Sequence, residues 1–139
     1  MKILHLSTVA MVLSVALSSS LDSATEKEPL SKSQALEIVR ALNTAELDIL
    51  LKTKNYAPLD SVVKGLREKP AGLAEFVDNS SNSSSGKIRD YQVSIITSSD
   101  GKHYKLALTP LEDSPACAVA FFSDESGVIY LGTAIDCKN

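Results

Sequence analysis

The chain has 139 residues, and its 14 Lys and Arg residues against 17 Asp and Glu residues give a formal net charge of −3. The basic residues are scattered rather than gathered in a stripe, which argues against nucleic acid and anionic membrane surfaces as partners. This length is sufficient for one domain around a single hydrophobic core. We therefore expect a single domain over residues 31–139.

The N-terminal segment has the order of a secretory signal peptide. Met1-Lys2 provides a short positive start, Ile3–Leu17 is largely apolar, and Ser18–Ser20 supplies the small residues expected before a cleavage site. We expect residues 1–20 to be removed, residues 21–30 to form a flexible leader, and the domain to be periplasmic or secreted from a bacterium, without membrane contact. The alternative is a retained anchor, although the apolar run is shorter than the roughly 20 residues that a membrane span needs.

Two cysteines, Cys117 and Cys137, are the only ones in the chain. In an oxidising compartment an isolated pair usually forms one disulfide, and this is our prediction. Such a bond contributes about 3 kcal/mol in the chain-entropy treatment. The alternative is a pair of free thiols, but the spacing is far from the Cys-x-x-Cys of redox enzymes.

A helical pattern begins at Ser31, which stands three residues before Gln34 as in a capping box. Apolar residues then recur at spacings of three and four, which is typical of one face of an amphipathic helix. The pattern predicts a helix over Ser33–Lys54, with Asn43 among the polar residues of the other face. A second, short helix is predicted over Leu59–Lys69.

A stretch rich in Ser and Asn separates the helical part from the strands. Residues 79–86 have the composition of a loop. We therefore expect no regular structure there, and the first strand is predicted to begin at Tyr91.

Two alternating segments, Tyr91–Ile95 and Tyr104–Leu108, predict a β-hairpin. The intervening Ser98–Gly101 suits a four-residue loop. A register that pairs Thr97 with Lys102 places the apolar and aromatic side chains of both strands on one face.

A second hairpin is predicted from Cys117–Phe122 and Val128–Leu131, with Asp124–Gly127 as the turn and Ser123 paired with Val128. Both faces of this hairpin are apolar, so it either lies between two layers or leaves one face for a partner. The candidate interaction surface consists of Val119, Phe121, Val128 and Tyr130. The alternative is that both faces are internal and the function lies elsewhere.

This order of helix, connector and sheet resembles the globular part of type IV pilins and pseudopilins. The resemblance covers residues 33–135 and rests on five segments in the same order. They are Ala41-Leu42-Asn43-Thr44-Ala45-Glu46, Asn55-Tyr56-Ala57-Pro58-Leu59, Asp90-Tyr91, Tyr104–Pro110 and Phe122–Tyr130.

The resemblance implies an α+β fold in which a long N-terminal amphipathic helix packs on an antiparallel sheet of about four strands, as in a pilin head. The chain departs from the family at its start. It lacks the Gly-Phe cleavage step, the Glu five residues into the mature chain, and the long apolar half-helix of pilins. The family's assembly mechanism therefore does not carry over.

Catalytic and metal-binding patterns are weak. After processing, His103 is the only histidine, and Asp100 lies close enough in sequence to orient it, but no nucleophile-elbow pattern is present. A solvated strand histidine is the favoured interpretation. Related pseudopilins bind calcium in C-terminal loops, and calcium favours several oxygen ligands. The corresponding loop carboxylates are Asp100, Asp124, Glu125 and Asp136, without EF-hand spacing.

The sequence thus predicts a non-enzymatic interaction or structural domain with no catalytic residue, metal or cofactor. Its expected partner is an envelope or secretion-system protein. Two alternatives stay open. One is a membrane-anchored minor pseudopilin that retains the N-terminal apolar segment, and the other is a small secreted hydrolase or inhibitor.

Overall fold

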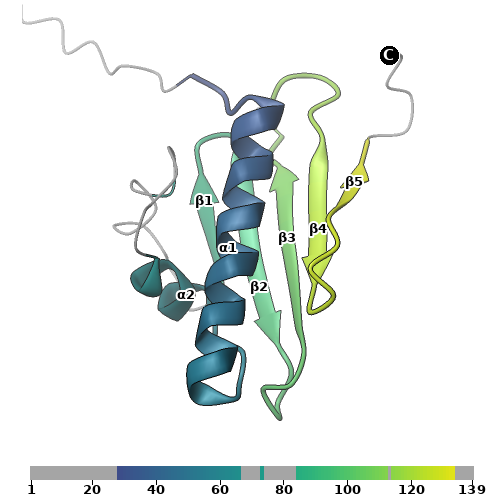
Figure 1. Ribbon diagram of the computed structural model, residues 1–139. Helices are drawn as coiled ribbons and strands as arrows, with labels where there is room; N and C mark the ends of the chain where they lie inside the picture. Colours follow the sequence, from purple (N-terminus) through teal and green to yellow (C-terminus); the bar gives the residue numbers. More distant parts are fainter. Residues whose placement is uncertain (1–27, 67–72, 74–83, 113, 134–139) are drawn as a thin grey trace, which may run out of the picture.

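Two helices cover one face of a five-stranded antiparallel sheet (Figure 1). The computed structural model describes residues 28–66, 73, 84–112 and 114–133. The strands follow one another in chain order across the sheet, from β1 at one edge to β5 at the other. The elements are α1 (Lys32–Thr53), α2 (Leu59–Gly65), β1 (Ser85–Ile88), β2 (Tyr91–Thr97), β3 (Tyr104–Pro110), β4 (Ala120–Asp124) and β5 (Tyr130–Gly132).

The predicted fold class, a long N-terminal amphipathic helix on about four strands in the manner of a pilin head, is wrong. The described residues form two helices and five strands, and α1 begins only at Lys32. The prediction missed strand β1, which pairs with β2 and consists of Ser85, Gly86, Lys87 and Ile88. Those four residues show no alternation and follow a Ser-rich stretch, so local pattern favoured a loop.

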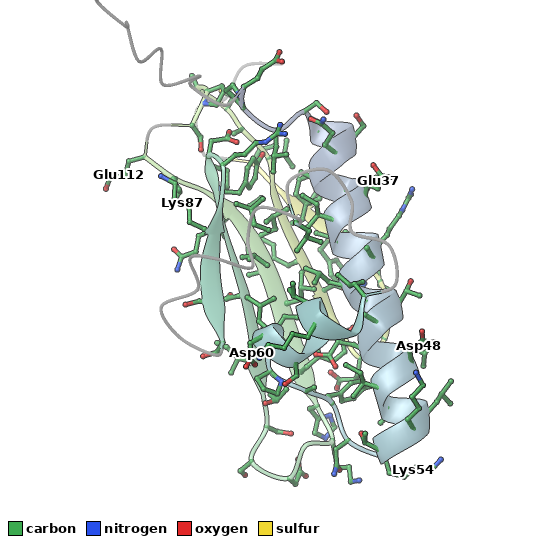
Figure 2. All side chains as sticks on the ribbon, turned by 90° about the vertical axis from the view of Figure 1, so that its left-hand side faces the viewer. Glu37, Asp48, Lys54, Asp60, Lys87 and Glu112 are labelled. Atoms are coloured by element: carbon green, nitrogen blue, oxygen red, sulfur yellow. The ribbon has the colours of Figure 1, made fainter. Side chains whose placement is uncertain are left out.

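Helix α1 starts and ends where local chemistry dictates. The Ser31 hydroxyl accepts the Gln34 N–H at 3.3 Å, and the Gln34 side chain accepts the Ser31 N–H at 2.9 Å, so the capping box is confirmed. The helix ends at Lys54, whose φ of 66° is left-handed. Exposed Glu37 and Asp48 lie on its outer side, while apolar side chains fill the space against the sheet (Figure 2).

The core lies between the helices and the inner face of β2, β3 and β4. Helix α1 packs on β3 and β4, and α2 packs on α1 and β2. The largest fully buried apolar side chains are Phe121, Ile38, Leu42, Leu59, Leu73, Ile88, Ile95, Leu106 and Leu108.

The hairpin of β2 and β3 differs from the predicted register by two residues. Thr97 pairs with Tyr104 rather than with Lys102. The loop is longer than the predicted Ser98–Gly101. Within it the Ser98 N–H donates to the His103 carbonyl at 2.9 Å, and Gly101 turns the chain with a φ of 68°. A shift of two residues keeps every side chain on its face, so the predicted buried face is confirmed.

The hairpin of β4 and β5 differs from the predicted register by one residue, which exchanges the two faces. Phe122 pairs with Tyr130, whereas the prediction paired Ser123 with Val128. The Ser123 hydroxyl instead donates to the Val128 carbonyl at 2.9 Å. This side-chain bond takes the place of a backbone pair between the two strands. The connection between β4 and β5 therefore contains one extra residue, and β5 begins at Tyr130.

The end of the predicted flexible leader is anchored. Residues 21–27 lie outside the described residues, but Leu30 is buried in the core and its N–H donates to the Asp90 carboxylate at 2.8 Å. Neither helix in the described part of the chain is long and apolar enough to cross a bilayer.

Candidate functional site

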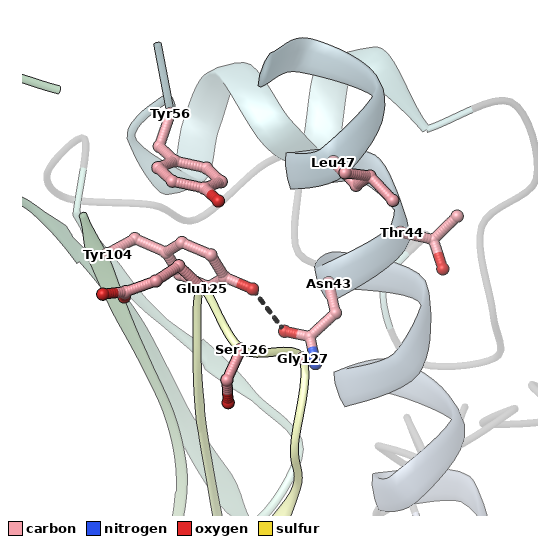
Figure 3. A pocket seen from close by; sticks show the side chains of 8 residues that line it. All are labelled: Asn43, Thr44, Leu47, Tyr56, Tyr104, Glu125, Ser126 and Gly127. Carbon is pink, nitrogen blue, oxygen red and sulfur yellow. Dashed lines mark hydrogen bonds between the residues drawn. The ribbon is translucent and has the colours of Figure 1, made fainter. Parts of the chain in front are cut away.

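A polar network lies beneath α1, in an otherwise apolar interface. The Tyr104 hydroxyl donates to Asn43 Oδ1 at 3.0 Å, as drawn in Figure 3, and Asn43 Nδ2 donates to the Ser123 hydroxyl at 2.8 Å. The Ser123 hydroxyl continues the chain to the Val128 carbonyl. Asn43 therefore faces the sheet rather than the predicted polar side of the helix, and it joins α1 to β3 and β4.

Glu46 is a fully buried carboxyl group on the same helix. Its Oε2 accepts the Ala57 N–H at 3.1 Å, and its Oε1 has no hydrogen-bond partner among the described residues. Burial raises the pKa of Glu46 to about 7, and the bond from Ala57 opposes that rise. Two segments on which the pilin resemblance rests, 41–46 and 55–59, thus contact each other through this carboxyl group.

A small cavity of about 230 Å³ opens beside this network, between α1 and the turn after β4 (Figure 3). The rings of Tyr56 and Tyr104 form one wall, with centroids 4.7 Å apart and planes at 55°. Burial raises the pKa of both phenols, and nearby Glu46 and Glu125 raise it further, so both stay neutral. The lining residues are Asn43, Thr44, Leu47, Tyr56, Tyr104, Glu125, Ser126 and Gly127.

His103 lies at the surface, where its Nδ1 is 2.7 Å from Glu125 Oε1. The predicted orienting residue, Asp100, does not bond to the imidazole. It accepts the Ser98 hydroxyl at 2.5 Å and the Lys102 N–H at 3.0 Å, and these two bonds lower its pKa. No serine hydroxyl in the described residues bonds to the His103 ring, so the geometry assembles no Ser-His-Asp site there. The exposed histidine predicted from the strand pattern is confirmed.

The loop carboxylates considered for calcium are engaged in their own turns. Asp124 accepts the Ser126 N–H at 2.9 Å, and its bonds to Ser126 lower its pKa. Glu125 pairs with His103. Residues 28–66, 73, 84–112 and 114–133 contain no group of three His, Cys, Asp or Glu side chains placed to hold a metal. Asp136 lies outside this part of the chain.

The four residues predicted as an interaction surface do not share a face. Phe121 is fully buried against the helix, and Val119 is half-buried, with its carbonyl accepting the Tyr91 hydroxyl at 3.1 Å. Val128 and Tyr130 are 48% and 56% exposed. The one-residue register difference accounts for the separation, because it turns Phe121 inward and Tyr130 outward.

Exposed apolar side chains gather instead along what we call the β5 margin, defined as Phe122, Val128, Tyr130 and Leu131. Phe122 and Tyr130 are paired neighbours on the face away from the helices. Leu131 is 55% exposed. Sequence reasoning identified the hairpin as apolar on both faces, but it selected the wrong set of residues because the register was set by a distant side chain.

A hollow of about 480 Å³ adjoins the β5 margin and includes Phe122, Gly132 and Thr133 in its lining. Cys117 also lines the hollow, is exposed and has a left-handed φ of 66°. Cys137 lies outside the described residues, so the Cys117–Cys137 disulfide stays a prediction.

Comparisons of the chain with protein-family models, with curated proteins and with solved structures found no match.

Proposed function

We propose that this chain is a non-enzymatic interaction domain of the bacterial cell envelope that binds another protein through the β5 margin. The observation that carries the proposal is the concentration of exposed apolar side chains in one hairpin. Among the described residues, seven large apolar side chains are exposed, and four of them are Phe122, Val128, Tyr130 and Leu131. Large apolar side chains that are exposed together in one hairpin favour an interaction site there.

The edge position of β5 supports the same conclusion. An edge strand presents unpaired backbone N–H and C=O groups, which are a template for another chain. In the described part of the chain, β5 pairs only with β4. The margin therefore combines exposed apolar side chains with free backbone groups. The periplasmic or secreted location is part of the proposal and rests on the apolar N-terminal segment. The proposed kinship with pilins rests on the five segments that resemble theirs.

Site-specific photo-cross-linking in cells of the native host tests this proposal. A benzophenone amino acid at Tyr130 should give a discrete protein adduct, because this side chain is exposed at the margin. The matched control carries the same probe at Ile96, which is 63% exposed on β2, away from β5. The Leu131→Lys substitution should abolish the Tyr130 adduct. Equal adducts from both positions, or none from Tyr130, would overturn the proposal.

Fractionation of the same cells tests the proposed location. The processed chain should appear in the soluble envelope or culture fraction, with its N-terminus near Leu21. An intact Met1 in the membrane fraction would contradict the proposed location and favour the anchored alternative.

A further inference from the structure

Strand β5 is short, at three residues, but lacks the other features that normally prevent a sheet edge from pairing. Natural edge strands carry charged residues, Pro or bulges, or are covered by another element. No charged residue or Pro occurs from Ser126 to Thr133. The opposite edge strand, β1, carries the exposed Lys87. The two edges of this sheet therefore differ, and only β5 is unprotected by its sequence.

The strand that would pair with β5 must be apolar on both faces. Tyr130 is exposed beside Phe122 on the outer face, and Leu131, the next residue, points to the other face and is also exposed. A second β5 strand has this same property. In an antiparallel pair with its two-fold axis at Leu131, Tyr130 of one copy lies opposite Gly132 of the other, so a large side chain meets a position without one.

Aromatic contacts would extend across such a pair. A Cβ atom built on Gly132 would lie 3.1 Å from the Phe122 ring, so this ring lies directly over the glycine. A Tyr130 side chain arriving opposite Gly132 would therefore meet the Phe122 ring of the other copy. Pairs of aromatic rings in such contact are favourable beyond the area that they bury.

Charge also favours β5 as the place where two copies meet. With a net charge of −3, copies of the chain repel one another over most of their surface. The stretch from Ser126 to Thr133 carries no charge. The nearest acidic side chain in the preceding turn, Glu125, is already paired with His103. Among the described residues from Ser126 to Thr133, an edge contact at β5 therefore brings no like charges into direct opposition.

The C-terminal segment of the same chain is the competing occupant of this edge. It has six residues, 134–139, and follows Thr133 directly. Thr133 and Cys117 line the same hollow, on the β4 side of the strand. Cys137 lies four residues beyond Thr133 in the sequence, and deletion of residues 134–139 tests whether this segment competes for the edge.

We propose that two copies of this chain pair antiparallel through β5, with Leu131 at the two-fold axis, to form one continuous sheet. This inference rests on the proposed function, because it uses the same β5 margin and names a second copy of this chain as the protein that binds there.

Sedimentation equilibrium of the protein as recovered from cells is the first test. The average mass should rise with concentration from that of one chain toward that of two. Leu131→Lys should hold the protein at the mass of one chain, and the matched control Ile96→Lys should leave the rise unchanged. Both side chains are exposed, and a circular dichroism spectrum identical to that of the wild type confirms that each variant is folded.

Cysteine cross-linking tests the register. Leu131→Cys should give a covalent dimer without reductant, because the two-fold axis places this residue beside its own copy within disulfide reach. Ile96→Cys should not. A wild-type protein with the mass of one chain at every concentration, equal dimer from both cysteine variants, or self-association that appears only after deletion of residues 134–139 would each overturn the inference. The Tyr130 photo-cross-link to another protein would still test the proposed function separately.

Discussion

The two hairpins of this sheet respond differently to the same kind of error in register. In the β2–β3 hairpin the observed register differs from the sequence-based one by two residues, and all buried side chains stay buried. In the β4–β5 hairpin the difference is one residue, and Phe121 and Tyr130 are separated onto opposite faces. A hairpin with one apolar face tolerates an imprecise prediction, whereas a hairpin with two apolar faces does not.

The cause lies in what fixes each register. The β2–β3 hairpin is closed by its own loop, through Ser98, Gly101 and His103. The β4–β5 hairpin is fixed from outside by Asn43, which lies 80 positions from Ser123 in the chain. The first register therefore depends on residues close in sequence, although alternation alone missed it by two residues, whereas the second depends on a residue far away in the sequence.

The largest expected effect distinguishes two adjacent phenylalanines of β4. Phe121→Ala should lower the free energy of unfolding by about 3–5 kcal/mol, because it removes a fully buried aromatic side chain from the core. Phe122→Ala should cost about 1 kcal/mol or less, because its side chain is 41% exposed. Urea denaturation of both variants measures the difference. Equal losses would show that the register assigned to β4 is incorrect.

Glu46 predicts a pH dependence of stability. Its pKa is raised from 4.5 to about 7, so the folded state holds this proton more tightly than the unfolded chain does. Stabilisation from this group is fully present below pH 4.5, declines as pH rises, and is lost above pH 7, for a change of up to about 3 kcal/mol. Chemical denaturation from pH 4.5 to 8 measures the decline.

The control for this dependence is Glu46→Gln, which keeps an acceptor for the Ala57 N–H and removes the titration. The free energy of unfolding of this variant should lack the decline that the wild type shows between pH 4.5 and 7. A decline of the same size in both proteins would assign it to another group.

A smaller effect is expected when the bond that fixes the β4–β5 register is removed. Ser123→Ala takes away the hydroxyl that bonds to Asn43 and Val128, and it should cost about 1–3 kcal/mol because Asn43 Nδ2 loses its acceptor. Hydrogen exchange of the Tyr130 and Leu131 amides should accelerate. The exposed Ser61→Ala, on α2 and away from this hairpin, serves as control, and equal exchange rates in the two variants would contradict this account of the register.

The smallest effect is expected at the surface pair of His103 and Glu125. His103→Ala should change the free energy of unfolding by about 0.5 kcal/mol or less, because both side chains are substantially exposed and exposed pairs contribute little. Thermal denaturation at neutral pH measures this change in the free energy of unfolding. A loss above about 2 kcal/mol would show that this pair holds the β4–β5 turn in place.

Much of the helical part was predictable, since the Ser31–Gln34 capping box and the apolar spacing give α1 bounds one residue from those predicted. The buried face of β2 and β3 was predictable from alternation. Strand β1 was not predictable, because its four residues form a strand only through pairing with β2. The candidate site was not predictable, because Asn43 and Glu46 are polar residues that tertiary contacts with Ser123 and Ala57 turn toward the interior.

Leu30 determines how far the chain can be shortened from its N-terminus. Its side chain is part of the core, and its backbone N–H satisfies a carboxylate oxygen of Asp90, itself a nearly buried residue. A protease that removes residues up to Glu28 leaves both contacts intact. A cut beyond Leu30 opens the core and leaves the Asp90 carboxylate without this donor. Shortening the chain as far as Leu30 therefore keeps these two contacts, and shortening it further removes them.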